Sequence, residues 1–306
     1  MNWHLVPQFA VTGLLAGGPI ALMALGLVLI FKSSYIFNFA QGQLLLIGAL
    51  MTWWLSIEAG LPLWISILLA LAISALLGLG IERITLRPMT GQPLLSIILM
   101  TLGLSQALQG LALLFFGGSQ RNFPQIFSAA DPYKITTPFQ FEGNPIVVIL
   151  KQNLVWSFLI AILGVIVIGA YFRFTKSGLA MRATSEDHEL AQSIGLRVQR
   201  IFGISWMLAA IVATTGGILL ATSSGLDLSL SVVVLAAFPA VLLGGLESIP
   251  GTIVGGLVIG LSQGLVSASQ IQIVRNASEI MPYIVLLLVL LIRPEGLFGQ
   301  ERIERI

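Results

Sequence analysis

Long stretches without a charged side chain dominate this sequence of 306 residues. They cover 9–31, 33–57, 59–81, 88–120, 152–172, 201–226, 228–246, 248–274 and 280–292. Most of them reach the ~20 apolar residues that carry a helix across ~30 Å of hydrocarbon. Only 9% of the residues are charged, whereas a soluble domain carries about 25% to cover its surface. The sequence therefore predicts an all-α integral membrane protein, a polytopic helical bundle.

One apolar region, 233–266, is interrupted by glycine and proline. Continuous spans are expected at 11–31, 39–57, 62–81, 93–116, 153–172, 201–221 and 279–292. With the broken region they make about eight or nine spans in a single transmembrane domain, 1–306. The residues of the break are Gly244, Gly245, Glu247, Pro250 and Gly251. Two short spans or a re-entrant hairpin both fit this region, and the break itself fits an extramembrane turn or unwound backbone beside a watery pathway.

Glycines follow the break at four-residue spacing, as Gly251 and Gly255, and then Gly256, Gly260 and Gly264. This spacing puts small residues on one helix face, where a neighbouring backbone can approach closely. We interpret them as packing positions, within the chain or between subunits, rather than as solute contacts.

Two connections between the spans are long. Residues 117–152 contain four prolines and several aromatics, which indicate an irregular folded loop. Residues 173–200 are rich in charge and have a helical pattern. Placing 173–200 in the cytoplasm puts 11 of the 15 basic residues inside and 4 outside, as the positive-inside rule favours. We therefore expect 117–152 to be external, the N-terminus outside and the C-terminus cytoplasmic.

The residues of most enzymes and metal sites are missing from this sequence. It has no cysteine, two histidines and no glycine–lysine phosphate-binding loop, so we expect no metal site and no ATP site in this chain. No pair of carboxylates lies inside an expected span, which argues against acid–base catalysis and against proton or sodium coupling. We expect a protein that is not an enzyme and that takes any energy from elsewhere.

Uncharged polar side chains are placed within the expected spans. Asn38, Gln41 and Gln43 open the second span, and Thr101, Ser105 and Gln109 share one face of the fourth. Hydrogen bonding between helices would explain them. They are also candidates for lining a pathway, because amides and hydroxyls would pass a neutral or zwitterionic solute without trapping it.

A short amphipathic helix is expected within 173–200. Ser185 would cap its first turn, which carries Glu186, Asp187 and Glu189, and Gly195 would end it. A solvated connector is the plainer alternative.

Several motifs identify a resemblance that covers residues 38–299. Glu189-Leu190-Ala191 followed by Gly195 resembles the E-A-A-x-x-x-G coupling loop of ATP-binding-cassette importer permeases, with leucine for the first alanine. The segments 38–43, 82–89, 101–105, 243–251 and 293–299 resemble motifs of the branched-chain amino acid permease family, of the LivH type, in the same order.

This resemblance implies a heteromeric importer. It would join this chain with a second homologous permease subunit or a second copy, two ATP-binding subunits that bind ATP and magnesium, and an external solute-binding protein. The coupling loop would include Glu186, Asp187, Glu189, Ala191 and Gly195, facing the ATP-binding subunits. The resemblance also implies a bacterial inner (plasma) membrane. Membrane lipid is the expected surrounding, and no nucleic acid is expected as a partner.

The substrate that the resemblance implies is leucine, isoleucine or valine. Gln41 departs from the family pattern, which has histidine at this place in the motif. Related permeases with similar motifs carry urea or short amides, so an amide permease of the same architecture stays an alternative. A channel that works without partners is a further alternative, although it has no evident use for a charged helix at 182–196.

Overall fold

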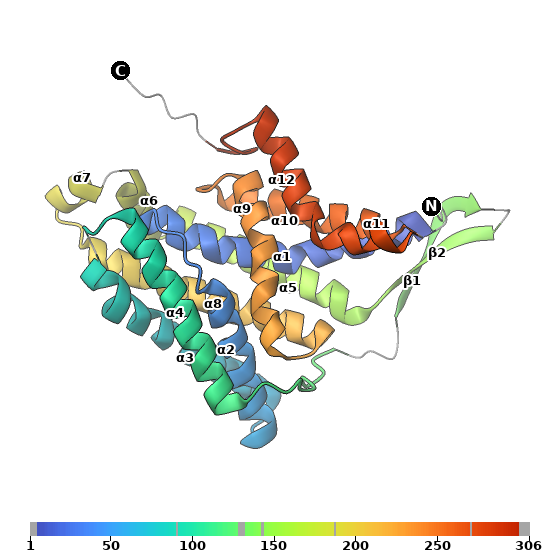
Figure 1. Cartoon of the computed structure of the whole chain (residues 1–306), viewed down its shortest axis with the longest axis horizontal. Coiled ribbons are helices and arrows are strands. Elements are labelled where there is room, and N and C mark those ends of the chain that lie inside the picture. Colours follow the sequence, from blue (N-terminus) through green and yellow to red (C-terminus); the bar gives the residue numbers. More distant parts are fainter. Residues whose placement is uncertain are drawn as a thin grey trace.

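The computed structural model describes residues 5–89, 91–127, 132–141, 144–186, 188–269 and 271–299. Figure 1 shows a helical bundle with one small β-hairpin at an edge. The α-helices are α1 (Val6–Ser34), α2 (Gln41–Trp53), α3 (Leu63–Ile81), α4 (Leu94–Phe116), α5 (Gln152–Phe174), α6 (Lys176–Glu186), α7 (His188–Ser193), α8 (Val198–Ser224), α9 (Ala237–Gly244), α10 (Ile249–Ser267), α11 (Gln272–Asn276) and α12 (Met281–Ile292). The other elements are the π-helices η2 (Trp54–Glu58) and η3 (Glu82–Leu86), the 3-10 helices η4 (Arg87–Met89), η5 (Leu228–Ala236) and η6 (Ala277–Glu279), and the strands β1 (Tyr133–Phe141) and β2 (Asn144–Leu150).

Fewer helices are long enough to cross a membrane than the sequence predicts. Among the described residues, six qualify by length and composition, or seven when the bent pair of Gln272–Glu279 and Met281–Ile292 counts as one span. The prediction of eight or nine spans is therefore too high. The α-helical part of α2 has only 13 residues before it continues as η2. The segment Leu228–Gly244 is also short, and it begins as a 3-10 helix.

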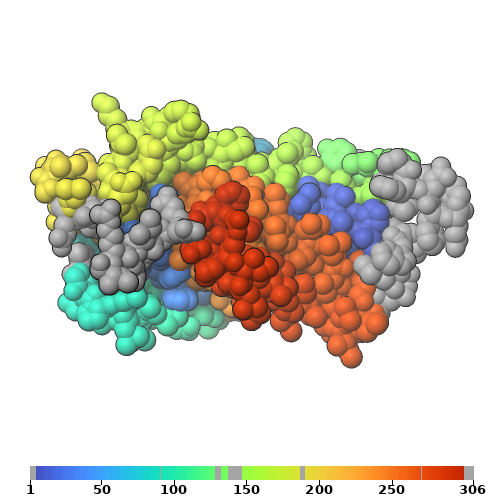
Figure 2. Space-filling view, turned by 90° about the horizontal axis from the view of Figure 1, so that it is seen from above, coloured from blue at the N-terminus to red at the C-terminus, as the bar shows by residue number. Residues whose placement is uncertain are grey.

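Helix α1 forms the centre of the bundle. Its most apolar window is 83% buried, against 22% for α4 and α5. An apolar surface on all sides suits such a position, since every side of the helix meets other helices. Helices α5, α8 and α10 pack against it, and in Figure 2 α1 is visible only as small blue patches between later segments.

Glycines bring α1 and α10 together as an antiparallel pair. Gly13 meets Gly260 and Gly264, and Gly17 meets Gly256. At these positions even a β-carbon would run into the backbone of the other helix. On another face of α10, Gly255 packs against the Ala240 backbone of α9. The interpretation of these glycines as packing positions is confirmed, and their contacts lie within the chain.

The connection 117–152 contains regular structure that the sequence did not predict. Strands β1 and β2 pair in antiparallel fashion, with Tyr133 opposite Leu150. Gln8 attaches this hairpin to the start of α1, since its side chain exchanges two hydrogen bonds of 2.7 Å with the Ile149 backbone. Before the hairpin, the Arg121 guanidinium lies 4.0 Å from the Trp53 ring centre at the end of α2. We call this side of the bundle the hairpin end.

Candidate functional site

The opposite side of the bundle, which we call the charged end, brings together several motifs. It is formed by the C-terminal ends of α1, α5 and α9, by α6 and α7, and by residues 293–299. Lys32, near the end of α1, donates a 2.9 Å hydrogen bond to the Glu247 carbonyl. The Tyr35 hydroxyl donates to the Ser185 carbonyl of α6. The end of α1 thus holds both the break after α9 and the loop after α5.

A cleft of about 1310 Å³ opens at the charged end. Its walls come from α1, α5, α6, the turn before α10 and the C-terminal segment. Its charged or hydroxyl-bearing lining residues are Lys32, Tyr35, Arg173, Arg182, Ser185, Glu186, Glu247, Ser248 and Glu295. Basic and acidic side chains both line it, so the cleft has no strong preference for one sign of charge.

The predicted break lies at this charged end, as a turn between the antiparallel helices α9 and α10. Gly245 begins the turn with a φ of 98°, a conformation that favours glycine. The Ser248 hydroxyl oxygen accepts a 3.0 Å hydrogen bond from Gly251 N–H and caps α10, with Pro250 in its first turn. The Glu247 side chain is half-buried. The break is thus a turn between two helices, and this turn also lines the cleft; its position outside the membrane stays a prediction.

The C-terminal motif covers this turn, a contact that sequence reasoning missed. Leu297 N–H donates to the Leu243 carbonyl (2.8 Å), and Phe298 N–H donates to the Gly244 carbonyl (3.2 Å). Gly296 has a φ of 82°, and a β-carbon there would lie 2.9 Å from the backbone nitrogen of Gly245. The sequence did offer a signal for this contact. Both motifs, 243–251 and 293–299, contain glycines, and glycine allows two stretches of backbone to approach closely.

The loop after α5 forms two helices rather than one. Helix α6 already begins at Lys176, where Thr175 Oγ1 accepts a 3.0 Å hydrogen bond from Gly178 N–H as a capping residue does. Ser185 lies inside α6 and donates to the Arg182 carbonyl (2.8 Å), so the prediction that it caps a helix is wrong. Glu186 ends α6 and is exposed.

The remaining predicted coupling residues belong to α7 and its end. Asp187 lies outside the described residues, and of Glu189 only the backbone is described. Ala191 is buried, whereas Gly195 has a φ of 89°. Gly195 N–H donates to Gln192 O (2.9 Å) and Leu196 N–H to Ala191 O (3.0 Å), the two bonds of a Schellman motif. The prediction that Gly195 ends the helix is confirmed.

Two apolar side chains that sequence reasoning did not single out are exposed in α7 and directly after it. Leu190 is 62% exposed and Ile194 is 69% exposed. Ile194 N–H donates to the Leu190 carbonyl (3.2 Å) at the end of α7, so the two residues lie on the same side of this last turn. The sequence could have indicated this surface, because two apolar residues at helical spacing are unusual in a loop that is rich in charge. Exposed apolar residues that are grouped on a surface mark a site of protein or membrane contact.

The polar residues before α2 are buried and bonded to each other. Asn38 Nδ2 donates to Gln41 Oε1 (3.2 Å), and Asn38 Oδ1 accepts from Ala40 N–H (3.0 Å). Gln41 Nε2 donates to the Ala209 carbonyl of α8 (3.2 Å). Gln43 is also buried, and its Oε1 has no hydrogen-bond partner among the described residues. Asn38 and Gln41 thus anchor the irregular chain before α2 to α8.

One residue of the predicted polar face of α4, Thr101, contacts the chain segment that Asn38 and Gln41 anchor. Thr101 is buried, and its hydroxyl lies 3.4 Å from the Phe37 carbonyl, which precedes Asn38. Ser105 and Gln109 follow on the same face and are half-buried. The structure thus brings Thr101 and Asn38 together, whereas Ser105 and Gln109 lie one and two turns further along α4. Their role in lining a pathway stays a prediction.

Known proteins resemble this chain over almost its whole length. A family model described as "Branched-chain amino acid transport system / permease component" matches residues 9–290. The high-affinity branched-chain amino acid transport system permease protein LivH of Escherichia coli (strain K12) is 27% identical, with 96% of each chain covered. The corresponding protein BraD of Pseudomonas aeruginosa is 26% identical, with 99% of each covered. A chain of the solved structure "PsaBC from Streptococcus pneumoniae in complex with Fab" shares the fold, with a TM-score of 0.50 and 15% identity over 97% of this chain and 95% of that one.

Proposed function

The chain belongs to the branched-chain amino acid transport system permease family, and we propose that it forms half of the translocation pathway of an ATP-binding-cassette importer. The names of LivH and BraD specify branched-chain amino acids, and we propose leucine, isoleucine or valine as the solute of this chain. The pathway would run through the multi-pass bundle between the charged end and the hairpin end.

The exposed apolar residues at α7 are the main support for the proposal that ATP-binding subunits dock there. Leu190 and Ile194 are exposed at the charged end, and burying them against a partner would remove apolar area from water. Two ATP-binding subunits, which bind ATP and magnesium and hydrolyse the nucleotide, would supply the energy. The α6–α7 loop is then the coupling loop, and the chain itself contributes no hydrolysis.

The contacts around α7 offer a route from this surface into the bundle. Gly195 joins α7 to the start of α8, and α8 carries the Ala209 carbonyl that holds Gln41. A shift of α7 would therefore move the chain before α2. A second route runs from Ser185 through Tyr35 to α1. Both routes join the proposed ATPase surface to the polar residues that are candidates for the pathway.

The proposed importer also includes a second permease subunit and an external solute-binding protein. A second homologous permease subunit, or a second copy of this chain, would complete the pathway. A solute-binding protein would dock at the hairpin end, which would place the N-terminus outside and the C-terminus in the cytoplasm of a bacterial inner (plasma) membrane.

Changing the exposed face of α7 tests the coupling role. Leu190→Glu with Ile194→Glu should abolish co-purification of the ATP-binding subunits and ATP-driven uptake, because it places two charges in an apolar contact. Ile135→Glu on the exposed side of β1 is the matched control, and it should leave co-purification unchanged. Full co-purification and uptake in the double variant would show that α7 is not the coupling element.

Uptake measurements test the solute separately. Cells that lack their own leucine transporters should accumulate labelled leucine only when they express this chain together with its partners. If labelled urea alone depends on this chain, the amide permease is the correct function. If the purified chain alone passes solute through vesicles without ATP, it is a channel, and the importer proposal fails.

A further inference from the structure

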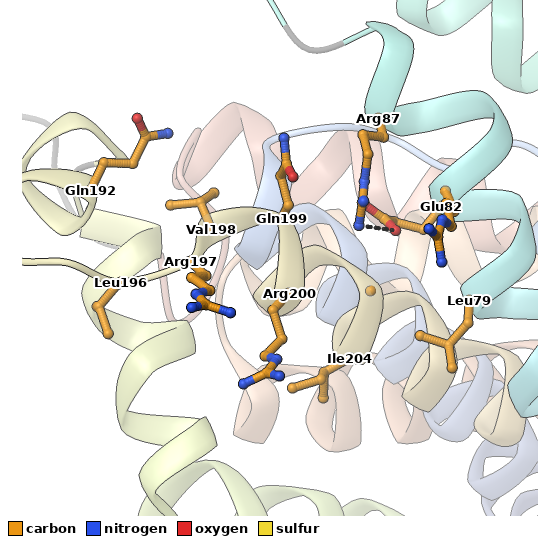
Figure 3. A pocket seen from close by; sticks show the side chains of 12 residues that line it. Leu79, Glu82, Arg87, Gln192, Leu196, Arg197, Val198, Gln199, Arg200 and Ile204 are labelled. Carbon is orange, nitrogen blue, oxygen red and sulfur yellow. Dashed lines mark hydrogen bonds and ion pairs between the residues drawn. The ribbon is translucent and has the colours of Figure 1, made fainter.

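A second cavity at the charged end, of about 680 Å³, is lined by arginine. It lies between the end of α3 with η3 and η4, helix α7 and the start of α8. Its arginines are Arg83, Arg87, Arg197 and Arg200. In Figure 3, Arg87 reaches Glu82 on one side of this arginine pocket, and Arg197 and Arg200 lie on the other side with α8. Residues 117 positions apart along the chain, Arg83 and Arg200, therefore contribute positive charge to one cavity.

The charge of the arginine pocket is not balanced by its own lining. Among the described lining residues, Glu82 is the one carboxylate. It is 2% exposed and forms a 3.4 Å ion pair with Arg87. Arg87 Nε–H remains without a hydrogen-bond partner among the described residues. One pair thus neutralises one arginine, and three positive charges and unused donors remain for an anion.

The pocket is also partly apolar, and it lies next to an exposed apolar helix surface. Leu79 and Ile204 line it beside the arginines. Nearby on the same helical segment, Leu76 is 68% exposed and Ile84 is 75% exposed. This segment, Leu63–Met89, is long and apolar enough to cross a membrane. Arginines at the end of an apolar helix, next to an exposed apolar surface, suit an amphiphile with a negatively charged headgroup. A free anion would contact only the arginines.

We propose that the arginine pocket binds the phosphate headgroup of an anionic phospholipid, with the acyl chains lying along the exposed side of α3. The planar guanidinium groups suit a phosphate because they donate paired hydrogen bonds to its oxygens. The lipid would connect η3 and η4, which follow α3, to the α7–α8 junction, since both regions supply arginines. This inference does not depend on the transported solute, so a failure of leucine uptake would leave it intact.

Retention of lipid by the purified full chain tests the proposal. The chain is reconstituted in vesicles that contain phosphatidylglycerol and phosphatidylcholine in equal parts with matched acyl chains, extracted, and analysed by native mass spectrometry. Phosphatidylglycerol should be retained in preference. Arg83→Gln with Arg200→Gln should weaken its binding by about fivefold per arginine, and so by about 25-fold for the pair.

The matched control is Arg173→Gln with Arg293→Gln, which removes two charges at the charged end but none from the arginine pocket. It should retain phosphatidylglycerol as the unchanged chain does. If the first pair does not fold, the single variants Arg83→Gln and Arg200→Gln replace it, each with a loss of about fivefold.

Three results would overturn the proposal. The first is equal retention of phosphatidylglycerol by the pocket variant and its control. The second is displacement of the lipid by inorganic phosphate at equal concentration, which would assign the pocket to free phosphate. The third is unchanged lipid retention with lost co-purification of ATP-binding subunits, which would assign the pocket to protein docking.

Discussion

The contact between α1 and α10 predicts a large effect from a single methyl group. A β-carbon at Gly17 would lie 2.6 Å from the Gly256 carbonyl oxygen and 2.9 Å from the Leu257 α-carbon. Both are backbone atoms of α10, so no side-chain rotation can relieve the overlap. Because an ordinary contact begins at 3.4 Å, Gly17→Ala must push the helices apart by roughly 0.8 Å, and the packed interface resists this.

The matched control is Gly103→Ala in α4, where nothing lies within 4 Å of the added carbon. Both changes gain the same helix propensity, about 1 kcal/mol. Their difference therefore isolates the steric cost, which overpacking in other proteins places at about 1–3 kcal/mol. We expect Gly17→Ala to be less stable than Gly103→Ala by about this amount.

Equilibrium unfolding in mixed detergent micelles measures the two free energies. Adding Gly13→Ala to Gly17→Ala should cost less than the sum of the single changes, because one displacement of α10 relieves both overlaps. Equal unfolding free energies for Gly17→Ala and Gly103→Ala would refute the close packing of α1 and α10.

Other contacts give smaller predictions. Gly195→Val should destabilise the end of α7 by about 1–2 kcal/mol, because the φ of 89° at this position is strained for a branched residue. Co-purification with ATP-binding subunits should therefore fall more for Gly195→Val than for Gly195→Asn. Equal losses in the two variants would contradict this prediction. Lys32→Met removes the hydrogen bond to Glu247 and should cost about 1.5–3 kcal/mol in unfolding and lower uptake, whereas unchanged stability would show that the bond contributes nothing. Thr214→Val removes the buried 2.6 Å bond to Ser74 and should cost about 0.6 to 1.7 kcal/mol, and a gain in stability would refute it.

The sequence predicts the helices well where a long apolar run determines them. The run expected to span 153–172 is the helix Gln152–Phe174, because the charged residues Lys151 and Arg173 bound the apolar run. The glycine spacing after the break also predicts packing correctly, since a small residue on every turn of a membrane helix has few other uses. Both predictions depend only on residues that are close together in the sequence.

Other features were missed because they depend on contacts distant in sequence or on competing local signals. Ser185 fits a cap when it is considered alone, but Thr175 supplies the earlier start, and the helix continues through Ser185. The β-hairpin within 117–152 is attached to Gln8, more than a hundred residues away. The span count is too high because α2 and the segment Leu228–Gly244 are short, and hydropathy alone does not give the length of a helix.

The contacts of Gln41 change the meaning of its departure from the family pattern. In sequence terms, an amide in place of histidine raises the possibility of urea or short amides as solutes. In the structure, both ends of the Gln41 amide are engaged, by Asn38 and by the Ala209 carbonyl. A β-carbon at Gly26 of α1 would also overlap this amide, so the surrounding helices fit it closely. A side chain that is bonded on both sides anchors the chain before α2, and its identity therefore constrains the packing of α1 and α8 more directly than it constrains the solute.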